Sequence, residues 1–398
     1  MNFVFISPQF PDSYWNFCDR LKQRGVNVLG IGDTPYDGLS NQLKGCLTEY
    51  YRVENMGDYN QMVRAIGYFT HKYGKIDWLE SNNEYWLEQD ARLRTDFNIT
   101  TGMKIEQVAN VRRKSTMKKF YEQAGVPVAR YHMVTTLEEG LTFANNVGYP
   151  VFVKPDGGMG AEDSYKLSNE DDLRWFYSVK QDVTYIMEEF ITGDIWSYDG
   201  ISDSNGDIIF ESVVSWPRSI ADIVNNKDHL AYYTANMLPE DLREKGRATI
   251  KAFDVRSRFF HLEFFRLVED KEGLGKKGDI VALEVNMRPA GGWTPDMYNY
   301  ANSVDVYSIW ADMVVYDKTY VDLTQKKYFA VYASQRYGKP YIHSHDDIRS
   351  RYADKIVLDE EIPEAISGAM GNHMWTVRVE TEEEKNEFIN YVHAVYEN

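Results

Sequence analysis

The sequence predicts a protein in which a parallel α/β domain is followed by α+β structure. Over the first hundred residues, short apolar runs alternate with amphipathic stretches, which is the pattern of a parallel sheet with helices on its faces. From about 183 to 315 the strand-like runs follow one another with few helices between them, as in antiparallel sheets. A last segment, 326–398, has the pattern β, α, β, β, α and predicts a small C-terminal α/β subdomain.

The first domain begins with two predicted βα steps. Asn2–Ser7 and Val26–Ile31 are apolar runs typical of buried strands, and Asp12–Arg24 is amphipathic and closed by Gly25, as a helix is. The turn after the first strand, residues 7–10, contains no glycine that would let a pyrophosphate approach the backbone. This argues against a dinucleotide-binding domain.

The middle of the chain changes pattern near residue 105. Lys104–Ala124 predicts one long helix rich in Arg and Lys, and Leu137–Asn146 predicts another. The apolar run Val151–Pro155 predicts a strand. Within the later antiparallel region we expect two helices, near Pro239–Ala252 and Asp305–Val315.

Composition excludes several classes of protein. The 398 residues include 44 Lys and Arg against 61 Asp and Glu, a net charge of −17 that would repel a phosphate backbone. No apolar run reaches the roughly 20 residues of a membrane helix, and the first residues lack the basic region of a signal peptide. Cys18 and Cys46 form no CxxC and no disulfide framework. We expect a cytoplasmic protein that binds small molecules and neither nucleic acid nor membrane; a homodimer is left open.

A lysine and a glycine-rich loop form the first candidate site. Lys154 ends an apolar strand, and Gly157, Gly158 and Gly160 follow at once. Glycines let successive backbone N–H groups converge on an anion, and the lysine adds a fixed positive charge. The pattern predicts a phosphate-binding loop, with a flexible hairpin as the alternative. The P-loop spacing GxxxxGK[ST] is absent.

Two carboxylates in neighbouring strands form the second candidate site. Glu263 lies in the run RFFHLEFFRLV and Glu284 in IVALEVNM, with Asn286 two residues later on the same strand face. Carboxylates in an apolar wall need a cation or a shared proton, and oxygen ligands favour Mg²⁺ or Mn²⁺ over zinc. The alternative is that both glutamates face solvent. Arg288, directly after these residues, is suited to hold a phosphoryl group or a carboxylate.

In this order and spacing the motifs resemble the ATP-grasp superfamily. They are the lysine strand with its glycine loop, then MEEFITGD, HLEFF and LEVNMRPAGG, and the resemblance covers roughly residues 105–315. The chain is most similar to the biotin carboxylase and carbamoyl phosphate synthase branch and to amino-acid and peptide ligases. The resemblance implies four parts: a pre-ATP-grasp parallel α/β domain at 1–104, a small lobe at 105–190, a large lobe at 191–320 and the C-terminal subdomain at 321–398.

The resemblance also implies roles for individual residues, with ATP and Mg²⁺ (or Mn²⁺) as cofactors. The phosphate-binding positions are Lys114, Lys154 and the glycine loop of Gly157, Gly158 and Gly160, which resembles a lid. The hinge that holds adenine is matched by Glu188, Glu189, Phe190 and Ile191. The metal ligands are matched by Glu263, Glu284 and Asn286, and Arg288 matches the arginine near the transferred phosphate.

One position departs from the family pattern. Many relatives have an acidic residue seven places after the first hinge glutamate, where it binds the ribose hydroxyls. Here that place holds Ile195, and Asp194 precedes it. Either Asp194 takes over through a local shift or ribose is held differently.

The implied activity is that of an ADP-forming ligase. A substrate carboxylate is activated as an acyl phosphate, and an amine or similar nucleophile then displaces phosphate. The alternatives are a bicarbonate-using carboxylase or carbamoyl phosphate synthase-like subunit, a small-molecule kinase, and a nucleotide-binding protein without turnover.

Three further residues or segments are weighed with their simpler interpretations. The run His343–Asp347 has a metal-like composition, but a helix cap at Ser344 or Asp346 is the simpler interpretation. Arg218 is either a contact for a substrate carboxylate or a surface arginine. Arg266 has odd spacing from Glu263 and should face away from it.

Overall fold

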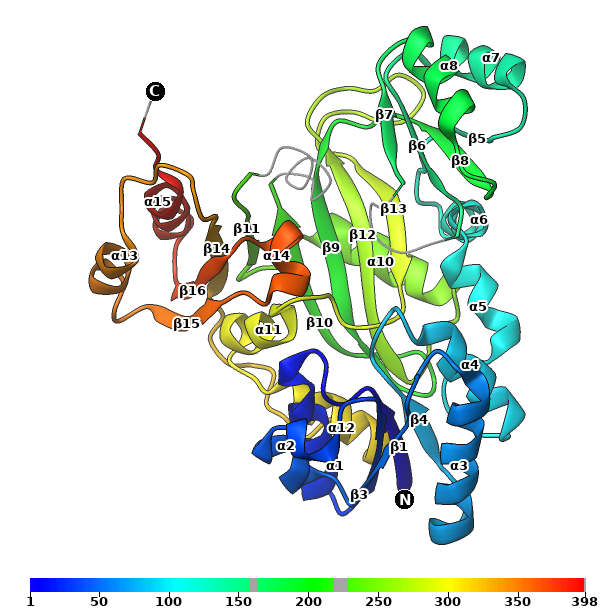
Figure 1. Cartoon of the computed structure of the whole chain (residues 1–398). Helices are drawn as coiled ribbons and strands as arrows, with labels where there is room; N and C mark the ends of the chain where they lie inside the picture. The colour runs from blue at the N-terminus through cyan, green and yellow to red at the C-terminus, as the bar shows by residue number, and fades with distance from the viewer. Residues whose placement is uncertain (158–162, 218–227, 397–398) are drawn as a thin grey trace.

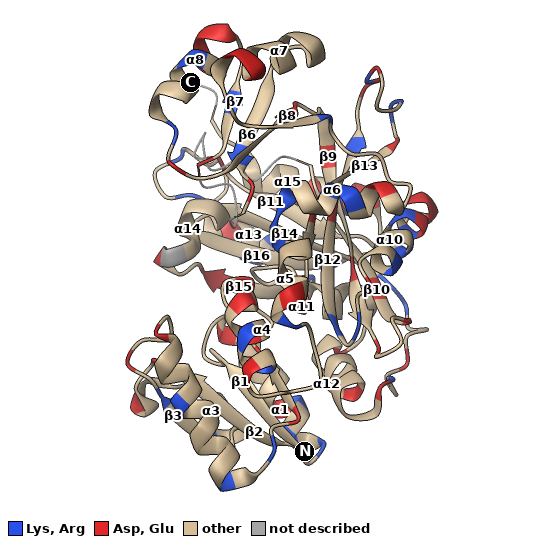
Figure 2. Cartoon of the chain, turned by 90° about the vertical axis from the view of Figure 1, so that its right-hand side faces the viewer, with Lys and Arg blue, Asp and Glu red and all other residues tan. Residues whose placement is uncertain are grey.

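The computed structural model describes residues 1–157, 163–217 and 228–396 and contains three β-sheets. In both views the small lobe lies at one end of the molecule and the N-terminal sheet at the other, with the large sheet between them (Figure 1 and Figure 2). Within the described residues no helix is both long and apolar enough to cross a bilayer.

The N-terminal sheet is parallel, as the sequence predicts. Its strands are hydrogen-bonded in the order β3-β2-β1-β4, so the chain adds strands on one side of β1 and then returns to its other side. The elements are β1 (Asn2–Ile6), η1 (Asp12–Tyr14), α1 (Trp15–Gln23), β2 (Asn27–Gly32), η2 (Tyr36–Gly38), α2 (Asn41–Cys46), β3 (Glu49–Arg52), α3 (Tyr59–Tyr73), β4 (Trp78–Glu80) and α4 (Leu87–Asp96).

A helix from late in the chain covers one face of this sheet. Phe3 and Phe5 of β1 pack edge-on against Trp310 of α12 (Val306–Tyr316), at ring-centroid distances of 5.5 and 6.3 Å. The alternate residues Val4 and Ile6 are buried on the other face, among residues of α3. Both faces are therefore apolar, which explains the continuous hydrophobic run in β1.

The small lobe is an antiparallel sheet with two helices on one face. The strands β5 (Tyr131–Met133), β8 (Tyr185–Glu189), β6 (Val151–Pro155) and β7 (Tyr165–Leu167) lie in that order, with α7 (Leu137–Val147) and α8 (Glu170–Val179). Val151, Val153 and Met187 pack with the helices. Lys154 and Glu188 are on the opposite face, because side chains alternate along a strand.

The large sheet has eight strands and extends into the C-terminal part of the chain. Its order is β13-β12-β9-β10-β11-β14-β16-β15, and the strands are β9 (Gly193–Ser202), β10 (Ile208–Trp216), β11 (Ala231–Thr234), β12 (Arg258–Leu267), β13 (Ile280–Asn286), β14 (Phe329–Gln335), β15 (Ile356–Glu361) and β16 (His373–Val379). Strand β11 pairs directly with β14. The predicted C-terminal subdomain is thus an extension of the large sheet rather than a sheet of its own.

The prediction of one continuous helix over Lys104–Ala124 is wrong, because the segment forms two helices. The segment forms α5 (Ile105–Arg112) and α6 (Lys114–Gln123), because Arg113 adopts an extended conformation and bridges to Gly157. Val111, Met117 and Tyr121 are buried in the core of the large lobe. These helices therefore pack with the large lobe, although the family resemblance implies that they belong to the small one.

Beyond residue 104, three helices of the described residues were not predicted by the sequence analysis. One is α8 of the small lobe, and two more lie later in the chain. They are α11 (Thr294–Asn302) and α14 (Glu364–Met370), beside the expected α10 (Glu240–Ala252), α12, α13 (His345–Arg351) and α15 (Glu382–His393). In α11 the first turn contains Pro295 and six of nine residues are buried, so no polar face marks the helix. Ser344 caps α13 by accepting a hydrogen bond from the backbone N–H of Asp347, as predicted.

A buried ionic cluster joins the N-terminal domain to strand β12. Glu80 Oε2 lies 2.8 Å from Arg94 NH2 and 3.7 Å from Arg258 NH2, and all three residues are buried. Burial by itself raises the pKa of the Glu80 carboxyl, but the two guanidinium groups outweigh it and lower that pKa. Arg258 Nε also donates to the carbonyl of Met287, at 3.1 Å.

Substitution of Glu80 tests this cluster. Glu80→Gln should lower the free energy of unfolding by about 3–5 kcal/mol, because it leaves two buried guanidinium groups without their carboxylate. The matched control, Glu170→Gln, breaks an exposed pair with Arg174 and should change it by about 1 kcal/mol or less. Urea denaturation measures both, and equal losses in the two variants would contradict the interpretation.

Candidate active site

The pairing of β12 with β13 places Glu263 directly opposite Glu284. Their Cα atoms are register partners, and Asn286 is opposite His261 on the same face. The side chains of both glutamates are 23% exposed, so each is largely but not fully removed from water. The even-numbered neighbours Leu262 and Phe264 are fully buried on the other face, which is why the carboxylates point away from the core.

The two carboxylates have different electrostatic surroundings. Burial raises the pKa of Glu284, and the nearby charge of Glu263 adds to the effect, although Lys114 acts in the opposite direction. The Nζ of Lys114 lies 3.5 Å from Glu284 Oε1. Burial also opposes ionisation of Glu263, but the hydrogen bond and charge of His261, together with the charges of Arg288 and Lys154, outweigh it and lower the pKa of Glu263.

His261 is a site residue that the sequence analysis missed. Its Nδ1 lies 2.5 Å from Asp199 Oδ1 and its Nε2 lies 2.9 Å from Glu263 Oε1. Burial lowers the pKa of the imidazole, but the two carboxylates more than reverse this and raise it to about 9. His261 is therefore protonated near neutral pH and donates to both neighbours. The sequence feature that could have identified His261 is its position two residues before Glu263, which places it on the same strand face.

Lys154 and Glu188 meet across neighbouring strands of the small lobe. Lys154 Nζ lies 2.8 Å from Glu188 Oε2, and Lys118 Nζ of α6 lies 2.6 Å from Glu188 Oε1. All three are buried. Burial alone would raise the pKa of Glu188, but the two lysines lower it to about 2. The result is a compact buried group with one more positive than negative charge.

Helix α6 connects the two lobes through one of its faces. Lys114, Lys118 and Tyr121 are spaced at i, i+4 and i+7, and so lie on the same side of the helix. Lys114 and Tyr121 reach Glu284, since the Tyr121 hydroxyl donates to the Glu284 carbonyl at 3.0 Å. Lys118 reaches Glu188 in the small lobe. The sequence analysis did not single out Lys118, although its i+4 spacing from Lys114 was visible.

Asp156 fixes where α6 begins. Its Oδ1 accepts from the backbone N–H of Ser115 at 2.7 Å, and its carbonyl accepts from that of Lys114 at 2.9 Å. Asp156 follows Lys154 by two residues. The end of β6 therefore sets the position of both predicted phosphate lysines. The sequence analysis assigned no role to this residue.

The predicted hinge residues after Glu188 do not share one environment. Glu189 Oε2 lies 2.7 Å from Arg130 NH2 and faces away from Glu188. Ile191 is buried in a small cluster with Ala129, and the Phe190 ring lies under the Lys166 ammonium, 4.1 Å from the ring centroid.

Asp194 does not join the carboxylate cluster. It is opposite Arg266 in the β9–β12 register, whereas Ile195 is opposite Phe265. Asp194 and Arg266 thus lie on the face opposite to Glu263. Arg266 itself binds Asp241 at 2.8 Å, which confirms that it faces away. The expectation that Asp194 replaces the ribose-binding residue is not supported by this placement.

Arg288 lies at the junction with the N-terminal domain. Its Nε is 3.5 Å from Glu84 Oε2, and its NH2 donates to Asn286 Oδ1 at 3.5 Å. Glu84 belongs to the loop between β4 and α4 and also lies 3.4 Å from Arg112. Of the glycine loop, Gly157 is described and bridges to Arg113; Gly158, Gly160 and the more distant Arg218 lie outside the described residues.

The donor set on β12 and β13 is compatible with a hard divalent cation. Among the described residues, no group of three or more His, Cys, Asp and Glu side chains is arranged to hold a metal. An ion between Glu263 and Glu284 would therefore rest on two carboxylates and the Asn286 amide oxygen. Mg²⁺ is commonly bound in this way, by few carboxylates with phosphate oxygens and water completing its shell.

Comparisons with known proteins give sequence similarity over part of the chain and a shared fold over nearly all of it. Residues 113–209 match the family model described as carbamoyl-phosphate synthase L chain, ATP binding domain. The L-arginine-specific L-amino acid ligase of Bacillus subtilis is 22% identical over 275 residues, or 67% of this chain. That alignment spans less than two thirds, 64%, of the length of the curated ligase.

Two solved structures share the fold over almost their entire lengths. An L-amino acid ligase from Bacillus licheniformis has a TM-score of 0.71 and 14% identity, covering 100% of this chain and 99% of the other. An N5-carboxyaminoimidazole ribonucleotide synthetase from Thermotoga maritima has a TM-score of 0.67 and 15% identity, covering 97% and 96%.

The role of Lys118 leads to a prediction with a matched control. Lys118→Met should raise the dissociation constant for ATP by about tenfold or more, because it removes a buried cation that shares Glu188 with Lys154. Lys119→Met, on the exposed side of the same helix, should leave it nearly unchanged. Calorimetric titration measures both constants. Equal affinities in the two variants would exclude Lys118 from the nucleotide site.

Proposed function

We propose that this chain, which has the ATP-grasp fold, is an ADP-forming ligase that joins a carboxylate to an amine. The observation that carries the proposal is the arrangement of buried charge. Lys154 of the small lobe and Lys118 of α6 both bind Glu188, and Lys114 of the same helix lies 3.5 Å from Glu284 of the Glu263–Glu284 pair. Cations close to a paired carboxylate site are what a polyphosphate with a divalent ion requires.

Lys114, Lys154 and the loop beginning at Gly157 are proposed to hold the ATP phosphates. The two lysines are fixed relative to one another by Asp156. Such preorganisation matters because phosphoryl transfer depends on positioning and charge stabilisation more than on covalent chemistry by the protein. Of the predicted hinge residues, Glu188 lies nearest these lysines, and Glu189–Ile191 follow it toward the large lobe.

Glu263, Glu284 and Asn286 would hold Mg²⁺. The ion, when bound, neutralises negative charge on the phosphate oxygens. His261 keeps Glu263 oriented from behind, since it donates to Glu263 and is itself anchored on Asp199. Partners of this kind fix the direction in which a metal-binding carboxylate points.

The proposed reaction has two steps. A carboxylate oxygen of the first substrate attacks the γ-phosphorus, and the bond to the β,γ-bridging oxygen breaks to release ADP. The amine nitrogen of the second substrate then attacks the acyl carbon. Phosphate leaves with the bonding electrons, and the nitrogen loses a proton. Arg288, beside Asn286, is proposed to hold the transferred phosphoryl group or the substrate carboxylate.

A second candidate follows from the matched family model. Its description names carbamoyl-phosphate synthase, so bicarbonate is the alternative to an organic carboxylate as the group that is phosphorylated. The sequence similarity to an amino acid ligase over 67% of the chain favours the organic carboxylate. Screening amino acids and bicarbonate for stimulation of ADP release distinguishes the two.

Removal of the metal-binding charge should weaken nucleotide binding. Glu284→Gln keeps the side-chain shape but removes a negative charge, so Mg²⁺ should no longer strengthen ATP binding and turnover should fall by roughly 10²-fold. Folding should survive, because the substitution relieves repulsion with Glu263. Calorimetry measures the affinity for ATP of the wild type and the variant, in buffer with Mg²⁺ and in buffer with EDTA. Equal affinity of the wild type in the two buffers would contradict the metal assignment.

Trapping with hydroxylamine tests the acyl phosphate. This small, uncharged nucleophile should replace the amine, so hydroxamate should accumulate in step with ADP when the correct carboxylate, ATP and Mg²⁺ are present. A kinase acting on a hydroxyl group would release ADP without hydroxamate. A protein that only binds nucleotide would release neither. ADP formation with a stable phosphorylated alcohol would end the ligase proposal.

A further inference from the structure

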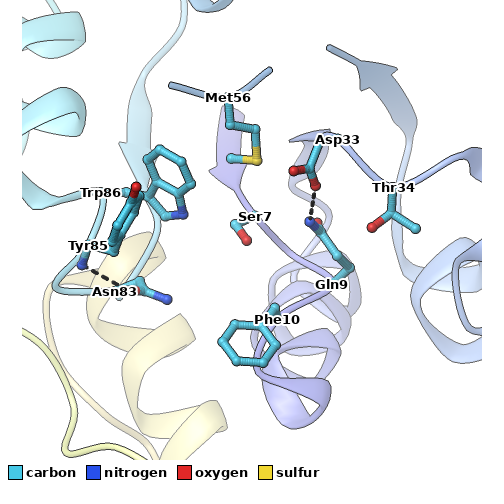
Figure 3. Close-up of a pocket in the computed structure, with 9 residues that line it drawn as sticks. All are labelled: Ser7, Gln9, Phe10, Asp33, Thr34, Met56, Asn83, Tyr85 and Trp86. Carbon is cyan, nitrogen blue, oxygen red and sulfur yellow. Dashed lines mark hydrogen bonds between the residues drawn. The ribbon is translucent and has the colours of Figure 1, made fainter. Parts of the chain in front are cut away.

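The N-terminal sheet has a hollow at the point where its strand order reverses. The chain places β2 on one side of β1 and β4 on the other. In open parallel sheets the loops after such strands diverge and leave a crevice that binds ligands. Here the crevice has a volume of about 510 Å³ and is lined from the loops after β1, β2 and β4, with Met56 from the loop after β3. Figure 3 shows Asp33 and Tyr85 on opposite sides of it, with Ser7 between them.

The wall of this hollow is aromatic and carries one charge. Phe10, Tyr85 and Trp86 are among the nine lining residues, and Asp33 is the single charged residue of the nine. Gln9 donates to Asp33 Oδ1 at 3.2 Å, while its own Oε1 is buried and has no hydrogen-bond partner among the described residues. Because that oxygen has no exposed surface, the charge that the hollow offers to a ligand is that of Asp33.

The loop after β4 links the hollow to the proposed reaction centre. Asn83 and Tyr85 line the hollow, and Glu84 between them lies 3.5 Å from Arg288. Glu84 Oε2 is buried and accepts no hydrogen bond from the described residues. The Tyr14 hydroxyl holds the same loop by donating to the Asn82 carbonyl at 2.7 Å. A molecule lying across the hollow would have one end at Asn83 and Tyr85, the neighbours of the residue that pairs with Arg288, and the other end near Asp33.

The chemistry of the wall selects against phosphate. A bound phosphate needs cationic side chains or converging backbone N–H groups. None of the nine lining residues is Lys or Arg, and the turn at residues 7–10 contains no glycine. A protonated amine or guanidinium fits instead, because a carboxylate and aromatic faces both attract cations.

We propose that this hollow binds the amine substrate of the ligase and selects one that bears no phosphate and has a cationic group at its far end. The inference rests on the proposed function, since it places the reacting nitrogen at the side of the hollow formed by Asn83 and Tyr85, which flank the partner of Arg288. Asp33 is then a specificity-determining residue. It contacts the part of the substrate that does not react.

A pair of probes with the same amine and opposite remote charges tests the selection. The probes are 1,4-diaminobutane and 3-aminopropyl phosphate, titrated against the full-length protein without nucleotide and followed by saturation-transfer NMR. The wild type should bind the diamine more tightly than the phosphate. Asp33→Asn should weaken diamine binding about fivefold, the scale of one partly exposed charge pair. The control Asp37→Asn, an exposed carboxylate outside the hollow, should not change it.

Reversing the charge at position 33 should create affinity for the phosphate probe, and a misfolded variant would not show such a gain in binding. Asp33→Lys should bind 3-aminopropyl phosphate more tightly than the wild type does. Equal diamine binding by Asp33→Asn and Asp37→Asn, or tighter binding of the phosphate probe than of the diamine by the wild type, would overturn the proposal.

The binding test and the hydroxylamine test fail independently. Diamine binding that depends on Asp33 in a protein that forms no hydroxamate would end the ligase function and keep the cation-selective hollow. If the protein forms hydroxamate but its diamine binding does not depend on Asp33, the ligase function is supported. The proposal that this hollow is the amine site is then contradicted.

Discussion

The placement of two carboxylates face to face is the constraint around which this structure is organised. The β12–β13 register puts Glu263 opposite Glu284 with most of their surface removed from water. Two negative charges in such surroundings repel one another and lose hydration, so positive groups must lie nearby. His261 supplies one from within the same sheet, and Lys114 supplies another from α6.

The same requirement explains why α6 occupies the junction of the lobes. A helix presents residues four apart on one side, so Lys114 and Lys118 serve two carboxylates, Glu284 in the large lobe and Glu188 in the small one. Asp156 holds the first turn of this helix at the end of the strand that carries Lys154. A movement of the small lobe relative to the large sheet would therefore change the distance between Lys118 of this helix and Glu188, whereas Lys154 and Glu188 would move together.

The N-terminal domain is tied to the same place by buried charge. Glu80 ends β4 and pairs with Arg258 at the start of β12, and Arg258 binds the carbonyl next to Arg288. The loop that carries Glu84 begins immediately after Glu80 and reaches Arg288. Because buried ion pairs tolerate little displacement, the hollow at the end of the parallel sheet is held at a fixed position relative to the proposed reaction centre.

The sequence by itself determined the elements whose signals are local. Alternation in β12 and β13 identified Glu263, Glu284 and Asn286 as one surface, and the strand before the glycine loop marked Lys154. Tertiary structure decided the rest. The extended Arg113 that splits the long helix, the pairing of β11 with β14 and the convergence of Lys118 on Glu188 each depend on a partner distant in sequence. Periodicity reports which face of an element is buried, but not what lies against it, and so it could not specify which buried charges would meet.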